Sequence, residues 1–242
     1  MFSAGTYEEL DKAGFTVVPG VLPAEHLASV AAAYDAAVES APPDEIKIGS
    51  STTRVNGLIN RGPEFDALYL HHLLLNACGR ILNEPFKLST MHARTLRSNT
   101  DAQNLHVDYQ RDHRGWTMIG FIHMVDPFRD DNGATRFVPG SHLWSTVPAE
   151  LLAGSRADYP GQVLACGPAG SMILFNGSVW HGHAANRSAE PRRSIQGAYI
   201  RRDAESKAGM STRLLPETLS RLSPLAKYVL AVPISGWPRS RF

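Results

Sequence analysis

The sequence predicts a mainly β protein, a sandwich or a barrel, that carries helices in its N-terminal part. Two observations lead to this prediction. Before residue 86 the apolar residues mostly recur three or four positions apart, as in amphipathic helices. From residue 86 onwards the chain breaks into short β-branched and aromatic runs separated by turn formers. The chain has 242 residues, a length that all-β domains commonly reach, so residues 1–242 are expected to form one domain.

The N-terminal part is expected to be helical with one short strand. Thr6 is a candidate N-cap for a first helical segment, and the β-branched run at 15–22 predicts the strand. Residues 23–38 have the apolar spacing of an amphipathic helix, and a further helix is expected over 66–82. The polar segment 41–63 is rich in turn formers, which indicates a long loop or a loose hairpin.

Short strands are predicted in the remainder of the chain, because each run is β-branched or alternating and is bounded by turn formers. They cover residues 86–96, 103–108, 116–125, 134–139, 161–166, 171–176 and 194–201. Asn132 and Gly133 lie between two of them. Both residue types tolerate a positive φ, which predicts a hairpin turn at this point.

The composition is that of an ordinary globular protein. The 24 basic residues balance 23 acidic ones, so nothing points to nucleic acid as a partner. The two cysteines, Cys78 and Cys166, lack C-x-x-C spacing, which fits a reducing compartment. No secretory leader and no apolar run long enough to span a membrane is recognised in the sequence, so we expect a cytoplasmic protein.

The segment Q-N-L-H-V-D-Y holds a histidine and a carboxylate two positions apart, His106 and Asp108. In an extended strand both side chains project from the same face and can contact one ion. An ordinary strand of alternating polarity has the same pattern, so H-x-D alone is weak support for a metal site.

A second segment supplies a further candidate metal ligand and a basic residue, both of which the H-x-D segment lacks. His181 follows an apolar strand, which is predicted to deliver it to a glycine-containing turn, and Arg192 lies eleven positions further on. Two histidines and one carboxylate leave coordination positions open, which suits a non-haem Fe(II) that binds a chelating 2-oxo acid and oxygen. The distal carboxylate of such an acid needs a permanently charged, bidentate partner, and Arg192 is the candidate.

Four motifs together are more specific than any one of them. They are G-F-T-V-V-P-G-V-L, H-V-D, D-N-G-A-T-R-F-V-P-G-S-H and W-H-G-H-A-A-N-R-S-A-E-P-R-R-S. With them the chain resembles the phytanoyl-CoA dioxygenase (PhyH-like) family of Fe(II)/2-oxoglutarate oxygenases over nearly its whole length. The resemblance implies a double-stranded β-helix (jelly-roll, cupin-like) core, with oxygen as the further co-substrate.

By this resemblance His106, Asp108 and His181 are the iron ligands, and Arg192 binds 2-oxoglutarate. The family places that arginine eleven residues after the distal histidine. Counting from His183 instead reaches a serine, so the spacing favours His181. Family members commonly carry Ser where this chain has His183, and this departure leaves the local co-substrate contacts open.

Thr135 and Gln103 resemble polar positions that contact 2-oxoglutarate in related enzymes. Each has an alternative role as a strand residue that satisfies its own backbone. Further residues are expected to be structural: His142 in a turn, Asn186 as the residue that fixes the loop after His181, and His123 in the core. Arg193 should point to the opposite face from Arg192, into solvent.

The resemblance implies an oxygenase that couples oxidative decarboxylation of 2-oxoglutarate to oxidation of a C–H bond in a small organic substrate. Hydroxylation is the default outcome, and cyclisation, desaturation and epimerisation are alternatives. Asp108 argues against halogenation, because halogenases of this superfamily have a small residue there. Two other hypotheses are a cupin-type metal enzyme without a 2-oxo acid and a jelly-roll binding protein without catalysis.

The predicted pocket walls are residues 48–61, 109–116 and 201–242, because such segments surround the open end of a jelly roll. Their polar residues include Arg54, Asn56, Arg111, His113 and Trp116, which favours a polyfunctional natural product over a bare fatty chain. A monomer or weak homodimer that carries out a tailoring step in specialised metabolism is expected.

Overall fold

The computed structural model describes residues 4–152, 154–206 and 213–233. The strands of these residues are β1 (Phe15–Val18), β2 (Ile46–Ile48), β3 (Thr52–Val55), β4 (Phe86–Leu96), β5 (Met118–Met124), β6 (Thr135–Phe137), β7 (Val163–Ala165), β8 (Met172–Asn176), β9 (His181–His183) and β10 (Arg192–Arg201). The helices are α1 (Ala4–Ala13), α2 (Ala24–Glu39), α3 (Asp66–Tyr69), α4 (His72–Leu82), α5 (Pro148–Leu152), α6 (Pro216–Arg221) and α7 (Pro224–Val229).

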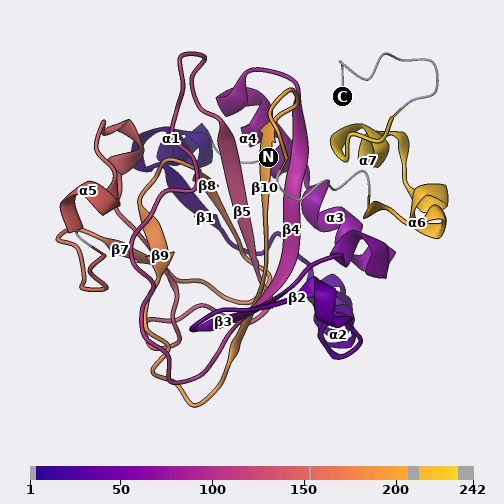
Figure 1. Ribbon diagram of the computed structural model, residues 1–242, viewed down its shortest axis with the longest axis horizontal. Coiled ribbons are helices and arrows are strands. Elements are labelled where there is room, and N and C mark those ends of the chain that lie inside the picture. Colours follow the sequence, from indigo (N-terminus) through magenta and orange to yellow (C-terminus); the bar gives the residue numbers. More distant parts are fainter. Residues whose placement is uncertain (1–3, 153, 207–212, 234–242) are drawn as a thin grey trace.

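Two antiparallel sheets form the centre of the fold (Figure 1). The larger has seven strands in the order β1-β8-β5-β10-β4-β3-β2, and the smaller has three in the order β7-β6-β9. Every pairing within them is antiparallel, although several neighbours are far apart in sequence. This is a double-stranded β-helix, so the predicted jelly-roll fold is confirmed.

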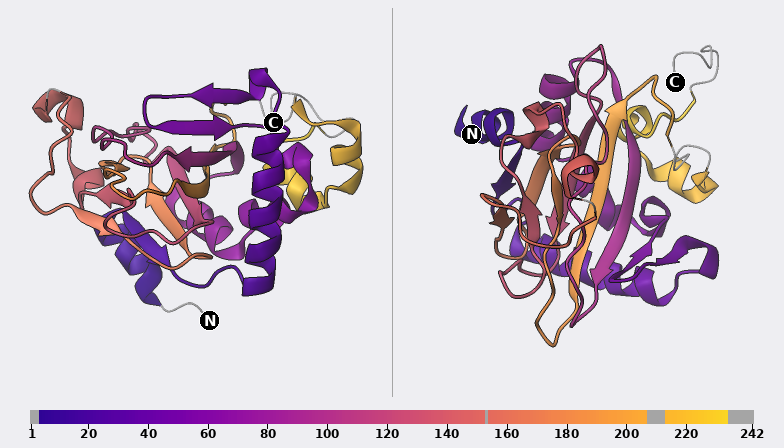
Figure 2. Two further views of the ribbon diagram at one scale, coloured as in Figure 1. Left: turned by 90° about the horizontal axis from the view of Figure 1, so that it is seen from below. Right: turned by 60° about the vertical axis from the view of Figure 1, so that its left-hand side comes forward.

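Strand β10 shows how the large sheet separates core from site. Ile195 and Tyr199 face the helical side and join the main hydrophobic core. Gln196 and Ala198 alternate to the other face and line a cavity. Helices α2, α3, α4, α6 and α7 lie on the helical side, whereas α1 and α5 lie toward the three-stranded sheet (Figures 1 and 2). The cavity therefore lies between the two sheets.

The polar segment 41–63 forms a hairpin, one of the two arrangements expected for it. Strands β2 and β3 pair with each other, and β3 continues the large sheet by pairing with β4. The hairpin is thus the edge of the seven-stranded sheet. No helix in the described residues has both the length and the apolar character that a bilayer crossing requires.

Two helical expectations need correction. Helix α1 begins at Ala4, so Thr6 lies inside the first turn and is not an N-cap. The helix expected over 66–82 is divided into α3 and α4, because the backbone at His71 is extended, with φ −60° and ψ 125°. Buried apolar residues still line one face of both pieces, which is why the apolar spacing continues across the break.

The turn at Asn132 and Gly133 is not a hairpin. It joins β5 of the large sheet to β6 of the small one, and only Gly133 has a positive φ, of 77°. The Asn132 side chain accepts a hydrogen bond from the Arg129 N–H and donates one to the Pro127 carbonyl oxygen. The Asn132 side chain thus closes a crossover between the sheets through these two bonds.

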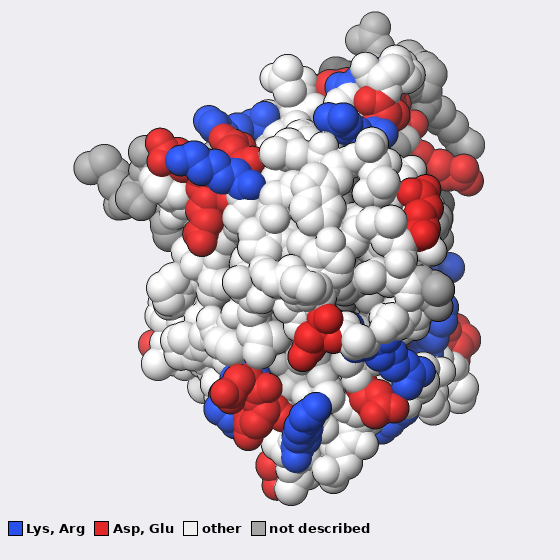
Figure 3. Space-filling view, turned by 90° about the vertical axis from the view of Figure 1, so that its left-hand side faces the viewer, with Lys and Arg blue, Asp and Glu red and all other residues white. Residues whose placement is uncertain are grey.

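The side of the molecule that carries α5 and β7 is largely uncharged in its middle (Figure 3). Acidic and basic residues are found side by side around the margin of this face (Figure 3). The segment between β6 and β8 contributes exposed apolar side chains, among them Leu143, Trp144 and Leu151. This face therefore differs in character from the charged cavity described below.

Replacing two glycines by alanine should have opposite effects on stability. A Cβ at Gly120 on β5 would lie 2.1 Å from the Phe175 ring, which is held against Phe137 and His181. Gly120→Ala should therefore lower the free energy of unfolding by about 1–3 kcal/mol through overpacking. Gly79 in α4 is exposed and a Cβ there meets nothing, so Gly79→Ala should raise the free energy of unfolding by about 0.5–1 kcal/mol. Denaturant titration of both variants checks this, and a loss at Gly79 would contradict it.

Candidate active site

Three residues from two segments bring their ligand atoms together. One nitrogen each of His106 and His181 and one carboxylate oxygen of Asp108 all lie within 4.8 Å of one another. The Asp108 oxygens are 3.8 Å from His106 Nε2 and 3.6 Å from His181 Nε2. Within the described residues no other group of histidine, cysteine and acidic side chains converges in this way.

Backbone hydrogen bonds hold the two segments in register. The His106 N–H donates to the His181 carbonyl oxygen at 2.9 Å, and the His181 N–H donates back to His106 at 3.0 Å. The Asp108 N–H donates to the carbonyl oxygen of Gly177. These bonds place both side chains of the H-x-D toward His181.

Two expectations about these segments were wrong. Residues 103–108 form an isolated bridge at His106 and not a strand, because the neighbouring backbone groups bond to His183 and Gly177 and not to one continuous partner. His181 is the first residue of β9 and comes after the turn at Gly177, whereas it was expected to lead into a turn. The same-face placement of His106 and Asp108 survives, because it needs extended backbone only over three residues.

The histidine rings are oriented by carbonyl oxygens. Nδ1 of His106 lies 3.1 Å from the Asn104 carbonyl oxygen, and Nδ1 of His181 lies 2.9 Å from that of Val179. A carbonyl only accepts, so each Nδ1 carries a proton, and each Nε2 is the nitrogen nearer Asp108. Burial, reinforced by His181, lowers the pKa of His106 to about 4, so this ring is neutral at pH 7. Two imidazole Nε2 atoms and a carboxylate suit Fe(II).

Arg192, at the start of β10, is a buried cation that forms no ion pair with any residue the structure describes. It is 2% exposed, and its guanidinium lies 3.6 Å above the Phe128 ring. Its Nε and Nη1 atoms are buried without a hydrogen-bond partner. Burial, and then the nearby Arg94, lowers the pKa of Arg192 to about 9. An unpaired buried charge is costly, so this site fits an anionic ligand such as a carboxylate.

All six residues expected to act in the site line one cavity of about 570 Å³. They are Gln103, His106, Asp108, Thr135, His181 and Arg192. Thr135 is buried on β6, opposite His183 on β9. Gln103 accepts a hydrogen bond from the Arg94 guanidinium at 3.2 Å. The sequence therefore identified residues that the fold brings to one place.

The predicted pocket walls are only partly correct. Arg54 and Asn56 line the cavity, whereas Arg111, His113 and Trp116 do not. The Trp116 ring packs near His142 and under the Arg111 guanidinium, so this turn folds away from the cavity. Of the C-terminal segment, Arg213 and Leu214 line the cavity, while residues 207–212 and 234–242 lie outside the described residues.

Glycine is required between the two histidines of β9. A Cβ at Gly182 would lie 3.0 Å from the Asn104 carbonyl oxygen and 3.2 Å from that of Gln103. The backbone that carries Gln103 thus passes directly over Gly182. His183 beyond it bonds to the Ser51 hydroxyl at 2.9 Å and lines the cavity without joining the three converging ligands.

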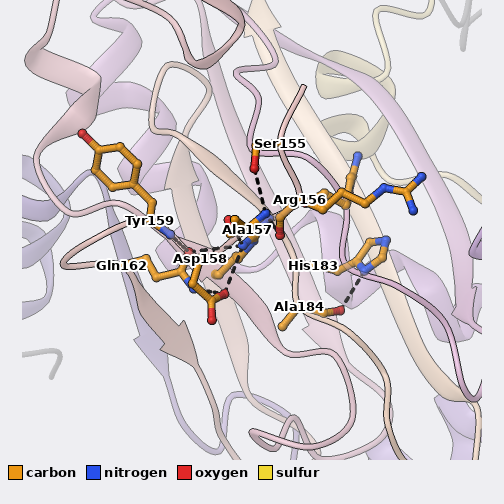
Figure 4. A network of polar contacts seen from close by, with 10 residues as sticks. Ser155, Arg156, Ala157, Asp158, Tyr159, Gln162, His183 and Ala184 are labelled. Atoms are coloured by element: carbon orange, nitrogen blue, oxygen red, sulfur yellow. Dashed lines mark hydrogen bonds and ion pairs between the residues drawn. The ribbon is translucent and has the colours of Figure 1, made fainter. Parts of the chain in front are cut away.

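Sequence reasoning missed Arg136, which is fully buried on β6. Its guanidinium donates to the Gln103 carbonyl oxygen at 2.6 Å and to the Ala157 carbonyl oxygen at 2.9 Å. It also reaches Asp158 and Gln162, in the network of the 155–162 loop (Figure 4). Arg136 ties this loop to the backbone that presents Gln103. An arginine within the strand pattern A-T-R-F-V was the only available signal.

The residues expected to be structural have structural contacts. His142 Nε2 bonds to the Asp11 carbonyl oxygen, and His123 Nε2 bonds to that of Leu68. Asn186 donates to the carbonyl oxygens of Arg97 and Glu190, which fixes the loop after His181. The expectation for Arg193 was wrong in one respect.

Arg193 is not a solvated cation. Its guanidinium pairs with Asp126 at 2.8 Å and with Asp35 of α2 at 2.7 Å. Strand alternation was correct in that Arg192 lines the cavity and Arg193 does not. Helix α2, which packs on the other face, supplies Asp35, and Asp126 follows β5; this packing was not visible in the sequence.

Comparisons with known proteins identify the family of the chain. A model of the family "Phytanoyl-CoA dioxygenase (PhyH)" matches residues 10–194. Dioxygenase cdmA of Talaromyces verruculosus is 33% identical over 177 residues, which are 63% of this chain and 55% of cdmA. Multifunctional dioxygenase prhA of Penicillium brasilianum is 29% identical over 214 residues, which are 78% of this chain and 69% of prhA. The chain thus spans little more than half the length of cdmA.

Solved structures show the same fold. The carbocyclase SnoK from nogalamycin biosynthesis superposes with a TM-score of 0.71 at 20% identity, covering 98% of this chain and 94% of SnoK. The epimerase SnoN, in complex with Fe³⁺, alpha ketoglutarate and nogalamycin RO, gives 0.69 at 20% identity over 88% and 89% of the two chains. With its family model matched over most of its length, the chain belongs to the phytanoyl-CoA dioxygenase (PhyH) family.

Proposed function

We propose that the protein is an Fe(II)- and 2-oxoglutarate-dependent oxygenase that oxidises a C–H bond of a small organic substrate. The observation that carries this proposal is a pair of sites in one cavity. The first is the converging His106, Asp108 and His181, and the second is the buried, unpartnered guanidinium of Arg192. A jelly-roll enzyme without a 2-oxo acid has no need of the second.

The cavity residues have different roles, which follow from their chemistry. His106, Asp108 and His181 would hold the metal on one side and leave its other positions to ligands. Arg192 would pair with the distal carboxylate of 2-oxoglutarate, with Thr135 and Gln103 as further polar contacts. Together with 2-oxoglutarate and oxygen, bound Fe(II) supplies the oxidation of a C–H bond, coupled to formation of succinate and CO₂.

The remaining task of the chain is to position the substrate. Cavity residues such as Met118, Ile122 and Ala198 provide an apolar wall against which a carbon skeleton can pack close to the metal ligands. Hydroxylation is the default outcome, because cyclisation, desaturation or epimerisation needs additional positioning. We infer a tailoring step in natural-product metabolism, a context supported by the carbocyclase and epimerase among the structural neighbours.

We also infer that the chain acts as a monomer or a weak homodimer. The cavity draws its described lining from both sheets and the adjoining segments of the same chain, so a second subunit is not needed to complete it. Sedimentation at several concentrations measures this directly, and a tight dimer at nanomolar concentration would contradict the inference.

Removing a metal ligand should abolish both Fe(II) binding and turnover. His181→Ala takes away one of three ligands, so Fe(II) binding measured by anaerobic calorimetry should be lost. His183→Ala is the matched control two residues away, and it should retain the metal because His183 does not converge with the ligands. If His183→Ala alone strips the metal, the ligand assignment is wrong by two residues.

Replacing Arg192, the buried cation, should selectively weaken the binding of 2-oxoglutarate. Arg192→Gln loses a desolvated, charge-assisted pair worth about 2–5 kcal/mol, so the KM for 2-oxoglutarate should rise at least about thirtyfold. Fe(II) affinity should change little. Arg193→Ala, the adjacent control, should cost stability through its lost ion pairs but leave this KM unchanged. Equal increases in KM at both positions would refute the role of Arg192.

The product should carry oxygen, a new ring bond, a double bond or an inverted centre, but no halogen. Asp108 supplies a carboxylate to the metal where a halogenase leaves room for chloride. Mass spectrometry of reactions run in excess chloride tests this point. A mass gain of one oxygen atom indicates the default hydroxylation, and a chlorinated product from the unmodified protein would refute the assignment.

A further inference from the structure

The cavity has a strong excess of positive charge. Its described lining contains the cationic side chains Lys47, Arg54, Arg94, Arg192 and Arg213, and a single carboxylate, that of Asp108. A divalent metal and the dianion 2-oxoglutarate cancel each other, so binding both leaves this excess of four charges unchanged. Beyond Arg192, the co-substrate therefore does not account for the cations of the cavity.

Three of these cations form a row across adjacent strands. Lys47 on β2 is directly opposite Arg54 on β3, and Arg54 is directly opposite Arg94 on β4. Like charges in directly opposed positions repel each other. The arrangement is therefore unfavourable unless an anion lies over the row.

None of the three cations forms an ion pair with a described acidic side chain. Arg94 donates to the neutral side chains of Gln103 and Gln196, and Asp108 of the same cavity acts on it at longer range. Among the described residues, the side chains of Lys47 and Arg54 have no hydrogen-bond or ion-pair partner. Glu45, which precedes the hairpin in the sequence, is paired with Arg61 at 2.6 Å.

The row divides into an inner and an outer part. Arg94 is half-buried, and its guanidinium is already bonded to Gln103 and Gln196, so it belongs to the inner part of the row. Arg54 is half-buried and Lys47 is exposed, at the sheet edge. The outer pair is thus open to a molecule that enters beside a bound co-substrate.

We propose that the substrate carries an anionic group, a carboxylate, sulfate or phosphate, and that Lys47 and Arg54 bind this group. The proposal rests on the proposed function, because it takes the metal and 2-oxoglutarate as bound. With its anion on the hairpin, the substrate extends its carbon skeleton over the cavity floor toward the metal ligands. Uncharged analogues of the same skeleton are discriminated against at this contact.

A matched pair of probes tests this. The full chain is loaded with Mn(II) and saturating 2-oxoglutarate, and binding of naphthalene-2-carboxylate and of uncharged 2-naphthamide is measured by proton relaxation. The carboxylate should bind about tenfold more tightly than the amide, as expected for one charge-assisted contact. The Lys47→Gln/Arg54→Gln variant should bind both probes with the same affinity, and Lys47→Gln alone should show part of the loss.

Lys12→Gln provides a control, because Lys12 is an exposed cation on α1 outside the cavity. This variant should bind both probes like the unmodified protein.

Equal affinity of the unmodified protein for the two probes, or no binding of either, overturns the proposal. Displacement of the carboxylate by additional 2-oxoglutarate overturns it as well, because the anion would then occupy Arg192. A parallel loss of 2-oxoglutarate affinity in Lys47→Gln would assign the row to the co-substrate instead. If the protein with Mn(II) does not bind 2-oxoglutarate at all, the proposed function is refuted. This result is distinct from a failure of the proposal about Lys47 and Arg54.

Discussion

The reciprocal backbone hydrogen bonds between His106 and His181 are the constraint on which the rest of the site depends. They join a segment outside either sheet to the first residue of β9, and they set the distance between the two rings. Without them three ligand atoms from two flexible segments would have to be ordered by the metal alone, at the cost of fixing several backbone torsions. With them the ligand geometry is prepared by the fold, and Gly182 is the residue that allows the two backbones to approach this closely.

Two buried arginines illustrate how the same residue type serves structure and function. Arg136 is fully buried and both its terminal nitrogens are met by carbonyl and side-chain oxygens, so that only its Nε lacks a partner and most of its desolvation is offset within the protein. Arg192 is as deeply buried, but two of its nitrogens have no partner. The difference between the two lies in unsatisfied hydrogen-bonding capacity and not in burial or charge. A buried cation left unsatisfied by its own protein is the clearest mark of a ligand site in this cavity.

The sequence predicted the parts that depend on short-range pattern. The bounds of β4 and the pair His106 and Asp108 follow from strand alternation, and the count from His181 selects Arg192. What was missed depends on distant packing. The role of Arg136 requires the 155–162 loop to fold back over β6, and the ion pair of Arg193 with Asp35 requires α2 to cover the other face of β10. At Asn132 and Gly133 the turn residues were recognised, but which sheet receives the next strand is decided by the whole topology.

Chemistry and recognition are built on different parts of this fold. The proposed metal ligands belong to β9 and the segment bonded to it, whereas the outer cations lie on the β2–β3 hairpin. This hairpin joins the large sheet by the pairing of β3 with β4, and Ser51 in its loop bonds to His183 of β9. An edge hairpin has a strand neighbour on one side only, so its outward residues change without repacking a core. The hairpin can thus be exchanged as a unit, both in evolution and in protein engineering. Grafting it between relatives would transfer substrate preference while the catalytic centre stays intact.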